Sequence, residues 1–202
     1  MRTSDVPSQH TGTQSNTESA VTAGNRALAL KVYARAKQRL LNVNAWGKFC
    51  GASGADFKLI DGQGSEDHGL AKEKDYFKIN IPGPGNASGH GYDWVKIENI
   101  KDNSDAGSEE ESITMTVRPS SSPDSLKQKA DHFLSEEATS TFTIYRSGNT
   151  VTAAVYGRNE KPNTSSQNII DKVRNAIVAT AAIIVGSKIQ WKLLVDGLLA
   201  DD

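Results

Sequence analysis

One glycine-rich segment of the chain gathers side chains that can bind a ligand or move a proton. Between Pro82 and Asp93 the sequence PGPGNASGHGYD places an imidazole, a phenol and a carboxylate among four glycines. Glycine lets backbone N–H groups approach an anion closely, and such side chains can transfer or orient protons. The segment therefore predicts a loop that closes over a ligand, with a mobile connection between two strands as the alternative.

A second polar group, Arg158-Asn-Glu160, follows a predicted strand, and binding residues often lie at the ends of such rigid elements. The alternative is a polar strand end beside Pro162. A nucleotide site is not supported, because the glycine spacing does not match G-x-G-x-x-G and no helix start follows it. The candidate ligand-binding residues are Asn86, His90, Tyr92, Asp93, Arg158 and Glu160.

No catalytic or metal-binding motif is recognisable. The four histidines have neither H-x-x-x-H nor H-E-x-x-H spacing, and the single Cys50 has no C-x-x-C partner. The run Gly51-Ala-Ser-Gly54 differs from a nucleophile elbow, because it follows a helix and lacks the second spacer. We therefore expect no metal, no cofactor and no assigned catalytic residue, while the question of whether the chain is an enzyme stays open.

Composition restricts the partners and the compartment. A formal net charge of -1 provides no overall field for holding nucleic acid or an anionic membrane. One cysteine excludes an intramolecular disulfide and suits a reducing compartment. Residues 1–24 lack the apolar run of a secretory signal, and no stretch reaches the roughly 20 apolar residues of a membrane span. We expect a cytoplasmic protein without nucleic-acid or membrane partners.

The elements that must position these residues are visible as periodic apolar patterns. In residues 25–42, Leu28, Val32, Ala36 and Leu40 recur every fourth position, and Tyr33 and Leu41 widen this apolar stripe, which predicts an amphipathic helix. Alternating residues predict strands within 57–60, 76–81, 94–100 and 113–117. A long helix is predicted over 166–199, and its segment 176–185 is apolar nearly all round.

A hairpin is predicted at Gly148-Asn149, where glycine suits the positive φ of a type II′ turn. If Ser147 faces Thr150, the register places two apolar pairs on one face of the hairpin. These pairs are Ile144 with Ala153, and Phe142 with Val155.

The predicted fold is α+β, with a mainly antiparallel twisted sheet of about five or six strands covered by the first and last helices. Residues 25–202 are predicted to form a single domain. Residues 1–24 are rich in small polar side chains and are predicted to be a disordered polar tail.

Four segments resemble a family of uncharacterised bacterial proteins. They are Ile81-Pro-Gly-Pro-Gly85, Gly91-Tyr-Asp-Trp-Val95, Thr139-Ser-Thr-Phe142 and Gly157-Arg-Asn-Glu160, and the resemblance covers most of the chain after residue 24. It implies a bacterial source and assigns no activity, cofactor or site residue.

Two functions fit the sequence. The first is a non-enzymatic binding or assembly protein, because the polar tail, the basic first helix and the apolar last helix suit contacts with protein partners or self-association into an oligomer. Basic residues from Arg26 to Arg39 and the mostly acidic segment 102–111 are its clearest charge features, although a helix face of this kind is also often simply solvated. The alternative is a small-molecule-binding protein or enzyme, with a pocket between the last helix and the sheet that is capped by residues 82–93.

Overall fold

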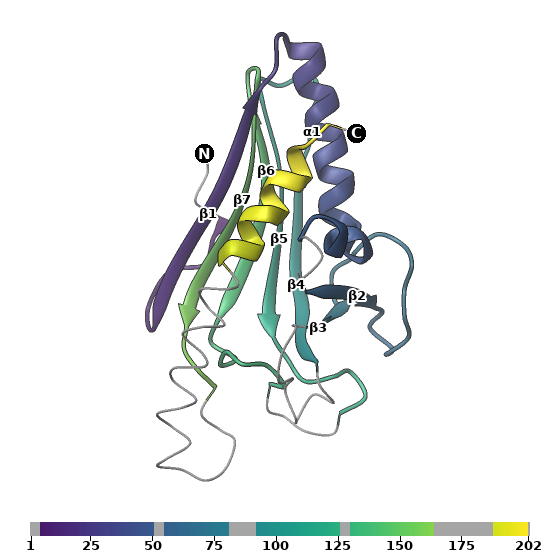
Figure 1. The fold of residues 1–202 in the computed structure, drawn as a ribbon, viewed down its shortest axis with the longest axis vertical. Helices are drawn as coiled ribbons and strands as arrows, with labels where there is room; N and C mark the ends of the chain where they lie inside the picture. Colours follow the sequence, from purple (N-terminus) through teal and green to yellow (C-terminus); the bar gives the residue numbers. More distant parts are fainter. Residues whose placement is uncertain (1–4, 51–54, 81–91, 126–129, 164–187, 202) are drawn as a thin grey trace.

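The computed structural model describes residues 5–50, 55–80, 92–125, 130–163 and 188–201. Within these ranges the chain forms a seven-stranded antiparallel sheet in the order β1-β7-β6-β5-β4-β3-β2 (Figure 1). The strands are β1 Thr13–Thr22, β2 Asp56–Ile60, β3 Tyr76–Asn80, β4 Asp93–Asn103, β5 Glu110–Pro119, β6 Thr139–Ser147 and β7 Thr150–Glu160. The helices are α1 Arg26–Leu41, the 3₁₀ helix η2 Val43–Lys48, and the C-terminal helix, which is described over residues 188–199.

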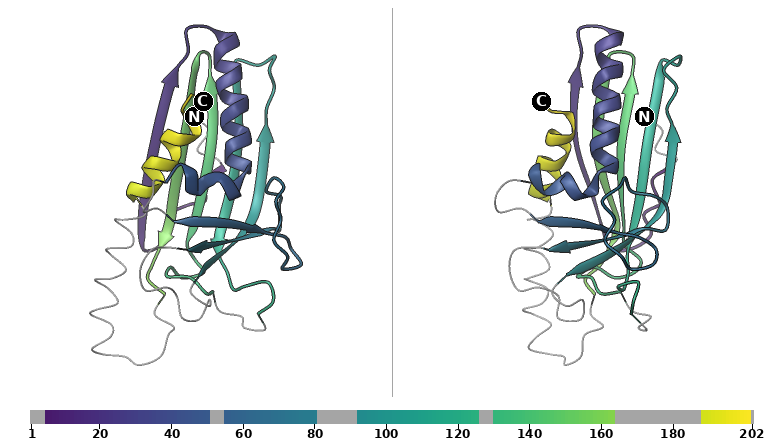
Figure 2. Two further views of the ribbon diagram at one scale, coloured as in Figure 1. Left: turned by 45° about the vertical axis from the view of Figure 1, so that its right-hand side comes forward. Right: turned by 90° about the vertical axis from the view of Figure 1, so that its right-hand side faces the viewer.

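The helices cover one face of the sheet. Figures 1 and 2 show α1 and the C-terminal helix side by side on that face. Buried residues of both helices belong to one apolar core with the inward side chains of β2 to β7. Arg39 of α1 donates hydrogen bonds to the carbonyls of Gly197 and Ala200, at 3.0 and 2.6 Å, and so ties the two helices together. The predicted α+β class and two-layer arrangement are confirmed.

The seventh strand comes from the segment predicted to be a disordered tail, and that prediction is wrong for residues 13–22. β1 pairs antiparallel with β7, with Thr17 opposite Val155 and Val21 opposite Val151. Its side chains are half-buried or exposed, so the strand is held mainly by backbone hydrogen bonds. The sequence prediction relied on apolar side chains that could be buried. A polar edge strand held by backbone pairing lacks such side chains, so its composition does not reveal it.

The first predicted helix is confirmed, and so is most of its predicted buried face; the exception is Leu28. Asn25 caps α1, with its side-chain oxygen accepting from the Leu28 N–H at 2.9 Å. The buried positions are Ala29, Tyr33, Ala36 and Leu40, while Leu28 is 46% exposed. Ala29 and Ala36 are fully buried, and small side chains at these positions let the helix lie close to the sheet.

The hairpin prediction is confirmed residue by residue. β6 and β7 pair with Ser147 opposite Thr150, Ile144 opposite Ala153 and Phe142 opposite Val155. Gly148 has a φ of 55°, as the turn requires. The opposite face of the sheet is polar, with hydroxyl pairs between Thr116 and Thr141 and between Thr114 and Thr143.

An aromatic cluster joins η2 and the C-terminal helix to the sheet. Trp46 is fully buried, and its ring centroid lies 5.4 Å from Phe57, 5.6 Å from Phe77 and 4.8 Å from Phe142. Trp191 of the C-terminal helix meets Phe142 edge to face at 5.3 Å. These contacts fix the position of the C-terminal helix above the sheet.

The described part of the long predicted helix, residues 188–199, is helical and buries Leu194, Val195 and Leu198. The apolar segment 176–185 lies outside the described residues. Among the residues that are described, no helix is long and apolar enough to cross a membrane.

Candidate functional site

A cavity lies between the C-terminal helix and the inner face of the sheet. The space open to the centre of a water-sized sphere is about 40 Å³. The residues that line it come from β1, from β3 to β7, from the segment 132–134 and from the C-terminal helix. They are Ser15, Phe77, Ile79, Val95, Val117, His132, Phe133, Leu134, Ser140, Phe142, Glu160, Lys188, Gln190 and Trp191.

Most of the cavity wall is apolar and rigid. Phe77, Val95, Val117 and Phe142 are all buried residues of the sheet, and each belongs to the main core. Trp191 closes the wall from the helix side through its contact with Phe142. Such a wall favours an apolar ligand body, because displacing water from it is favourable.

One corner of the cavity is polar, and sheet register explains why. Gly157 of β7 lies between Ser15 of β1 and Ser140 of β6. A Cβ atom at Gly157 would collide with the Glu160 carboxylate and the Ser15 hydroxyl, so the missing side chain leaves room for both groups. Asn159 has a φ of 55°, which interrupts the strand alternation and brings Glu160 to the same face as Gly157.

Only one of the two Glu160 carboxylate oxygens has a hydrogen-bond partner in this corner. Oε1 accepts from the Ser15 hydroxyl at 3.2 Å. Oε2 is buried and has no hydrogen-bond partner. Burial raises the pKa of Glu160, while the Ser15 hydroxyl and the positive charges of Lys188 and Arg158 act in the opposite direction. The corner therefore offers a buried hydrogen-bond acceptor to whatever occupies the cavity.

His132 supplies a neutral imidazole to the same cavity. Its Nδ1 accepts from the Leu134 N–H at 2.9 Å, and its ring stacks on Phe133 at 4.4 Å. Burial lowers the pKa of His132 to about 3, so the ring is uncharged at neutral pH. Because Nδ1 is an acceptor, the remaining ring proton must be on Nε2, which is a donor.

The segment that carries His132 is held by its neighbours on both sides. The Asp93 carboxylate accepts from the Phe133 N–H at 2.9 Å, and the Trp94 N–H donates to the Asp131 carbonyl at 2.9 Å. The side chain of Asn163 donates to the His132 carbonyl at 3.0 Å. The loop is therefore a fixed part of the cavity wall.

The structure brings one of the predicted site residues into the cavity and places three others outside its lining. Glu160 lines the cavity, and Asp93 lies behind it as a support for the segment 131–133. Arg158 donates to the Ser15 carbonyl at 3.1 Å and to the Asn16 side chain at 2.8 Å, so it joins β1 to β7. Tyr92 lies 5.2 Å from the Lys78 ammonium. Asn86 and His90 lie outside the described residues, as does most of the predicted loop 82–93.

Sequence reasoning missed most of the polar groups in the cavity. Ser15 lies in the segment that was predicted to be disordered, and His132 follows no motif that marks a ligand. Gln190 and Trp191 lie in a helix whose apolar pattern predicts packing and nothing further. Only the polar strand end at Glu160 gave a usable signal.

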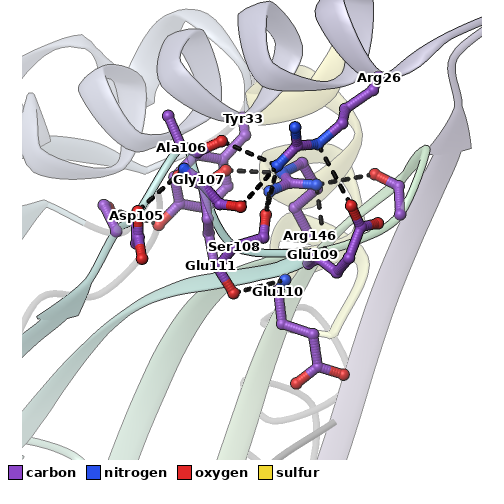
Figure 3. A network of polar contacts seen from close by, with 12 residues as sticks. Arg26, Tyr33, Asp105, Ala106, Gly107, Ser108, Glu109, Glu110, Glu111 and Arg146 are labelled. Carbon is purple, nitrogen blue, oxygen red and sulfur yellow. Dashed lines mark hydrogen bonds and ion pairs between the residues drawn. The ribbon is translucent and has the colours of Figure 1, made fainter.

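Most basic side chains of the first helix form hydrogen bonds and ion pairs within the chain. Arg26 donates to the carbonyls of Ala106, Gly107 and Ser108 at 2.9 to 3.0 Å and forms an ion pair with Glu109 at 3.5 Å (Figure 3). Further along the helix, Lys37 pairs with Asp102 at 2.5 Å and Arg35 with Asp201 at 2.8 Å. The basic helix and the acidic segment 102–111 are thus partners of each other.

A buried ion pair lies next to this contact, at the opposite end of β7 from Glu160. Arg146 is fully buried, and its Nε donates to the Glu111 carboxylate at 2.6 Å (Figure 3). Its other nitrogens donate to the carbonyls of Ser108 at 2.7 Å and Gly148 at 2.9 Å. This network joins the β4–β5 turn to the β6–β7 hairpin.

A larger hollow on the polar face of the sheet, about 290 Å³ by the same measure, contains several carboxylates. Each of the principal ones already has a partner. Glu110 accepts from the Tyr145 hydroxyl at 2.9 Å, Asp5 pairs with Lys101 at 2.7 Å, and Glu109 and Glu111 pair with arginines. Within the described ranges, no three His, Cys, Asp or Glu residues gather as metal ligands would.

Comparisons with known proteins find no matching family model and no matching curated protein. Among solved structures, the chain is similar to the Zhui aromatase/cyclase from Streptomyces sp. R1128, at 7% identity over 92% of this chain and 94% of that one, with a TM-score of 0.41. It is also similar to a START superfamily protein from Mycobacterium smegmatis, at 10% identity over 93% and 99%, with a TM-score of 0.40. A third is truncated norcoclaurine synthase from Thalictrum flavum, at 10% identity over 94% and 99%, with a TM-score of 0.35.

Proposed function

We propose that the protein binds a small, mainly apolar organic molecule in the cavity between the C-terminal helix and the sheet. The observation that carries this proposal is the cavity itself, which combines a rigid apolar wall with a few convergent polar groups. Glu160 and the neutral His132 are the polar groups whose positions the fold determines most closely.

The competing proposal of an assembly protein has less support. Three of the positive charges of α1 that suggested a docking face, those of Arg26, Arg35 and Lys37, are paired with the acidic turn and with Asp201 near the C-terminus. Exposed large apolar side chains in the described parts of the chain are few, and only Ile189 and Leu193 lie one turn apart on one helix, at 64% and 41% exposure. Light scattering tests this proposal, because a stable oligomer that dissociates on Ile189→Glu would support it.

Binding can be measured through Trp191, whose ring lines the cavity. We expect small aromatic compounds to change the tryptophan fluorescence of the wild-type protein in a saturable way. Ser140→Leu fills the cavity from β6 and should weaken this binding at least tenfold, which corresponds to about 1.4 kcal/mol. The matched control is Ser147→Leu, at the exposed end of the same strand.

Trp191→Phe identifies the source of the signal, since Trp46 and Trp94 remain in that variant. Equal binding by wild type and Ser140→Leu would place the ligand elsewhere and contradict the proposal.

A further inference from the structure

Two buried polar atoms in the cavity lining lack hydrogen-bond partners. They are Oε2 of Glu160, on β7, and Nε2 of Gln190, on the C-terminal helix. Gln190 also interacts with the Cys50 thiol, but sulfur is only a weak hydrogen-bond acceptor, so the amide nitrogen is left without a strong partner. Buried polar groups are nearly always paired, because an unpaired one loses its hydration without compensation. Both residues line the same cavity, Glu160 from the sheet and Gln190 from the helix, so one ligand in the cavity can be the partner of both atoms.

The two atoms need opposite partners. The carboxylate oxygen needs a donor, and the amide nitrogen needs an acceptor. A hydroxyl group supplies both, since it has one O–H donor and two lone pairs. The chemistry of these two atoms therefore specifies the polar part of the ligand.

The charges around the cavity argue for an uncharged ligand. A carboxylate ligand would be repelled by Glu160. An ammonium ligand would have to enter where Lys188 and Arg158 already offset the Glu160 charge. Apart from Gln190, His132 and the hydroxyls of Ser15 and Ser140, which are uncharged, the rest of the wall is aliphatic and aromatic and stabilises neither charge.

We propose that Glu160 and Gln190 select a small, neutral, hydroxyl-bearing ligand whose apolar body lies against Phe77, Phe142 and Trp191. This inference rests on the proposed function and adds the ligand class and the two residues that determine it. Ser15 acts as a positioning residue, because it holds the other carboxylate oxygen and leaves Oε2 directed to the ligand.

Three probes of similar size separate the contributions. Phenol both donates and accepts, anisole only accepts, and toluene does neither. We use the ratio of the toluene Kd to the phenol Kd, measured by titration calorimetry or ligand-observed NMR, as the hydroxyl preference of each variant. Because toluene is the more apolar probe, a change in this ratio between variants is more informative than its absolute value.

In Glu160→Met the hydroxyl preference should fall about tenfold or more relative to wild type, with toluene binding nearly unchanged. Glu160→Gln keeps an acceptor and should retain most of the preference. Gln190→Met should also lower the preference, and it provides an independent variant if Glu160→Met does not fold. The matched control, Glu137→Met, removes an exposed carboxylate that is paired with Lys161 and should leave the ratio unchanged.

The outcomes separate this inference from the proposed function. If toluene and phenol bind but neither Glu160→Met nor Gln190→Met changes the ratio of their Kd values, then Glu160 Oε2 and Gln190 Nε2 hydrogen-bond to water and not to the ligand. The proposed ligand class would then be wrong. If no probe binds and Ser140→Leu behaves as wild type, the proposed function itself fails. A lowered ratio in both variants, with anisole binding between toluene and phenol because it can accept from Gln190 but cannot donate to Glu160, supports the inference.

Discussion

The polar corner of the cavity depends on three residues close together in β7. Gly157 leaves space, Asn159 changes the direction of the chain, and Glu160 fills the space with a carboxylate. The strand alternation alone would not bring residues 157 and 160 to one face, because they are an odd number of positions apart. The left-handed conformation of Asn159 is therefore what connects the sequence to the site.

Gly157→Ala tests this arrangement. The new methyl group would displace the Glu160 carboxylate and the Ser15 hydroxyl, which are the movable ends of side chains. We expect a stability loss below about 1 kcal/mol together with loss of the hydroxyl preference. Urea unfolding and the toluene-to-phenol ratio measure the two effects. Gly24→Ala, where a Cβ meets no atom within 4 Å, is the control, and an unchanged ratio in Gly157→Ala would contradict this account of the corner.

His132 predicts a pH dependence of stability. Its pKa is lowered from 6.5 to about 3 in the folded protein. Between pH 6.5 and pH 3, His132 is therefore protonated in the unfolded chain and neutral in the folded protein. The stabilisation is present above pH 6.5 and is lost as the pH falls toward 3, amounting to at most about 3 kcal/mol between pH 7 and pH 4.

The measurement is the free energy of unfolding from pH 7 to pH 4 for wild type and His132→Asn, since asparagine keeps an acceptor near the Leu134 N–H. We expect wild type to lose more stability than His132→Asn over this range. The exposed His68, changed to Asn, is the control and should follow wild type. Parallel curves for wild type and His132→Asn would show that the imidazole is not held neutral by burial.

At the scale of elements, the sequence predicted the strands and helices with a clear periodic pattern. The alternation in β3 and β5 and the glycine of the β6–β7 turn are local features, so the sequence identifies them without tertiary information. β1 was missed because its stability comes from pairing with β7. The predicted face of α1 was mostly right, since Tyr33, Ala36 and Leu40 are buried, but its first residue Leu28 is exposed and Ala29 is buried in its place.

The Arg146–Glu111 pair is a buried polar connection between β6 and β5. Arg146→Met leaves Glu111 buried without its partner and removes donors from the carbonyls of Ser108 and Gly148. Breaking a buried pair in this way costs about 3–5 kcal/mol. The control is Arg118→Met, which breaks the partly exposed pair with Glu98 and should cost about 1 kcal/mol or less.

Chemical denaturation of the two variants checks this prediction. Adding Glu111→Leu to Arg146→Met should recover part of the lost stability, because the uncompensated charge is removed. If both arginine variants lose the same small amount of stability, Arg146 contributes no more than a surface ion pair.

At the scale of the whole molecule, the cavity joins residues that are far apart in the sequence. Ser15 and Glu160 are 145 positions apart and still share a hydrogen bond. The alternative reading of the sequence placed a pocket between the last helix and the sheet, and a cavity is found there. Most of its polar residues could not be predicted, because they face one another only after β1 joins the sheet and the C-terminal helix packs across it.

The central claim is that this cavity binds a small molecule, and NMR distance contacts to a bound probe test it most directly. With methyl-labelled protein and toluene, we expect intermolecular contacts to the methyl groups of Ile79, Val95 and Val117, and their loss in Ser140→Leu. Methyl groups of Ile189 and Leu193, which are exposed on the C-terminal helix, report surface binding. Contacts confined to these two residues, or no contacts at a saturating toluene concentration, would contradict the claim.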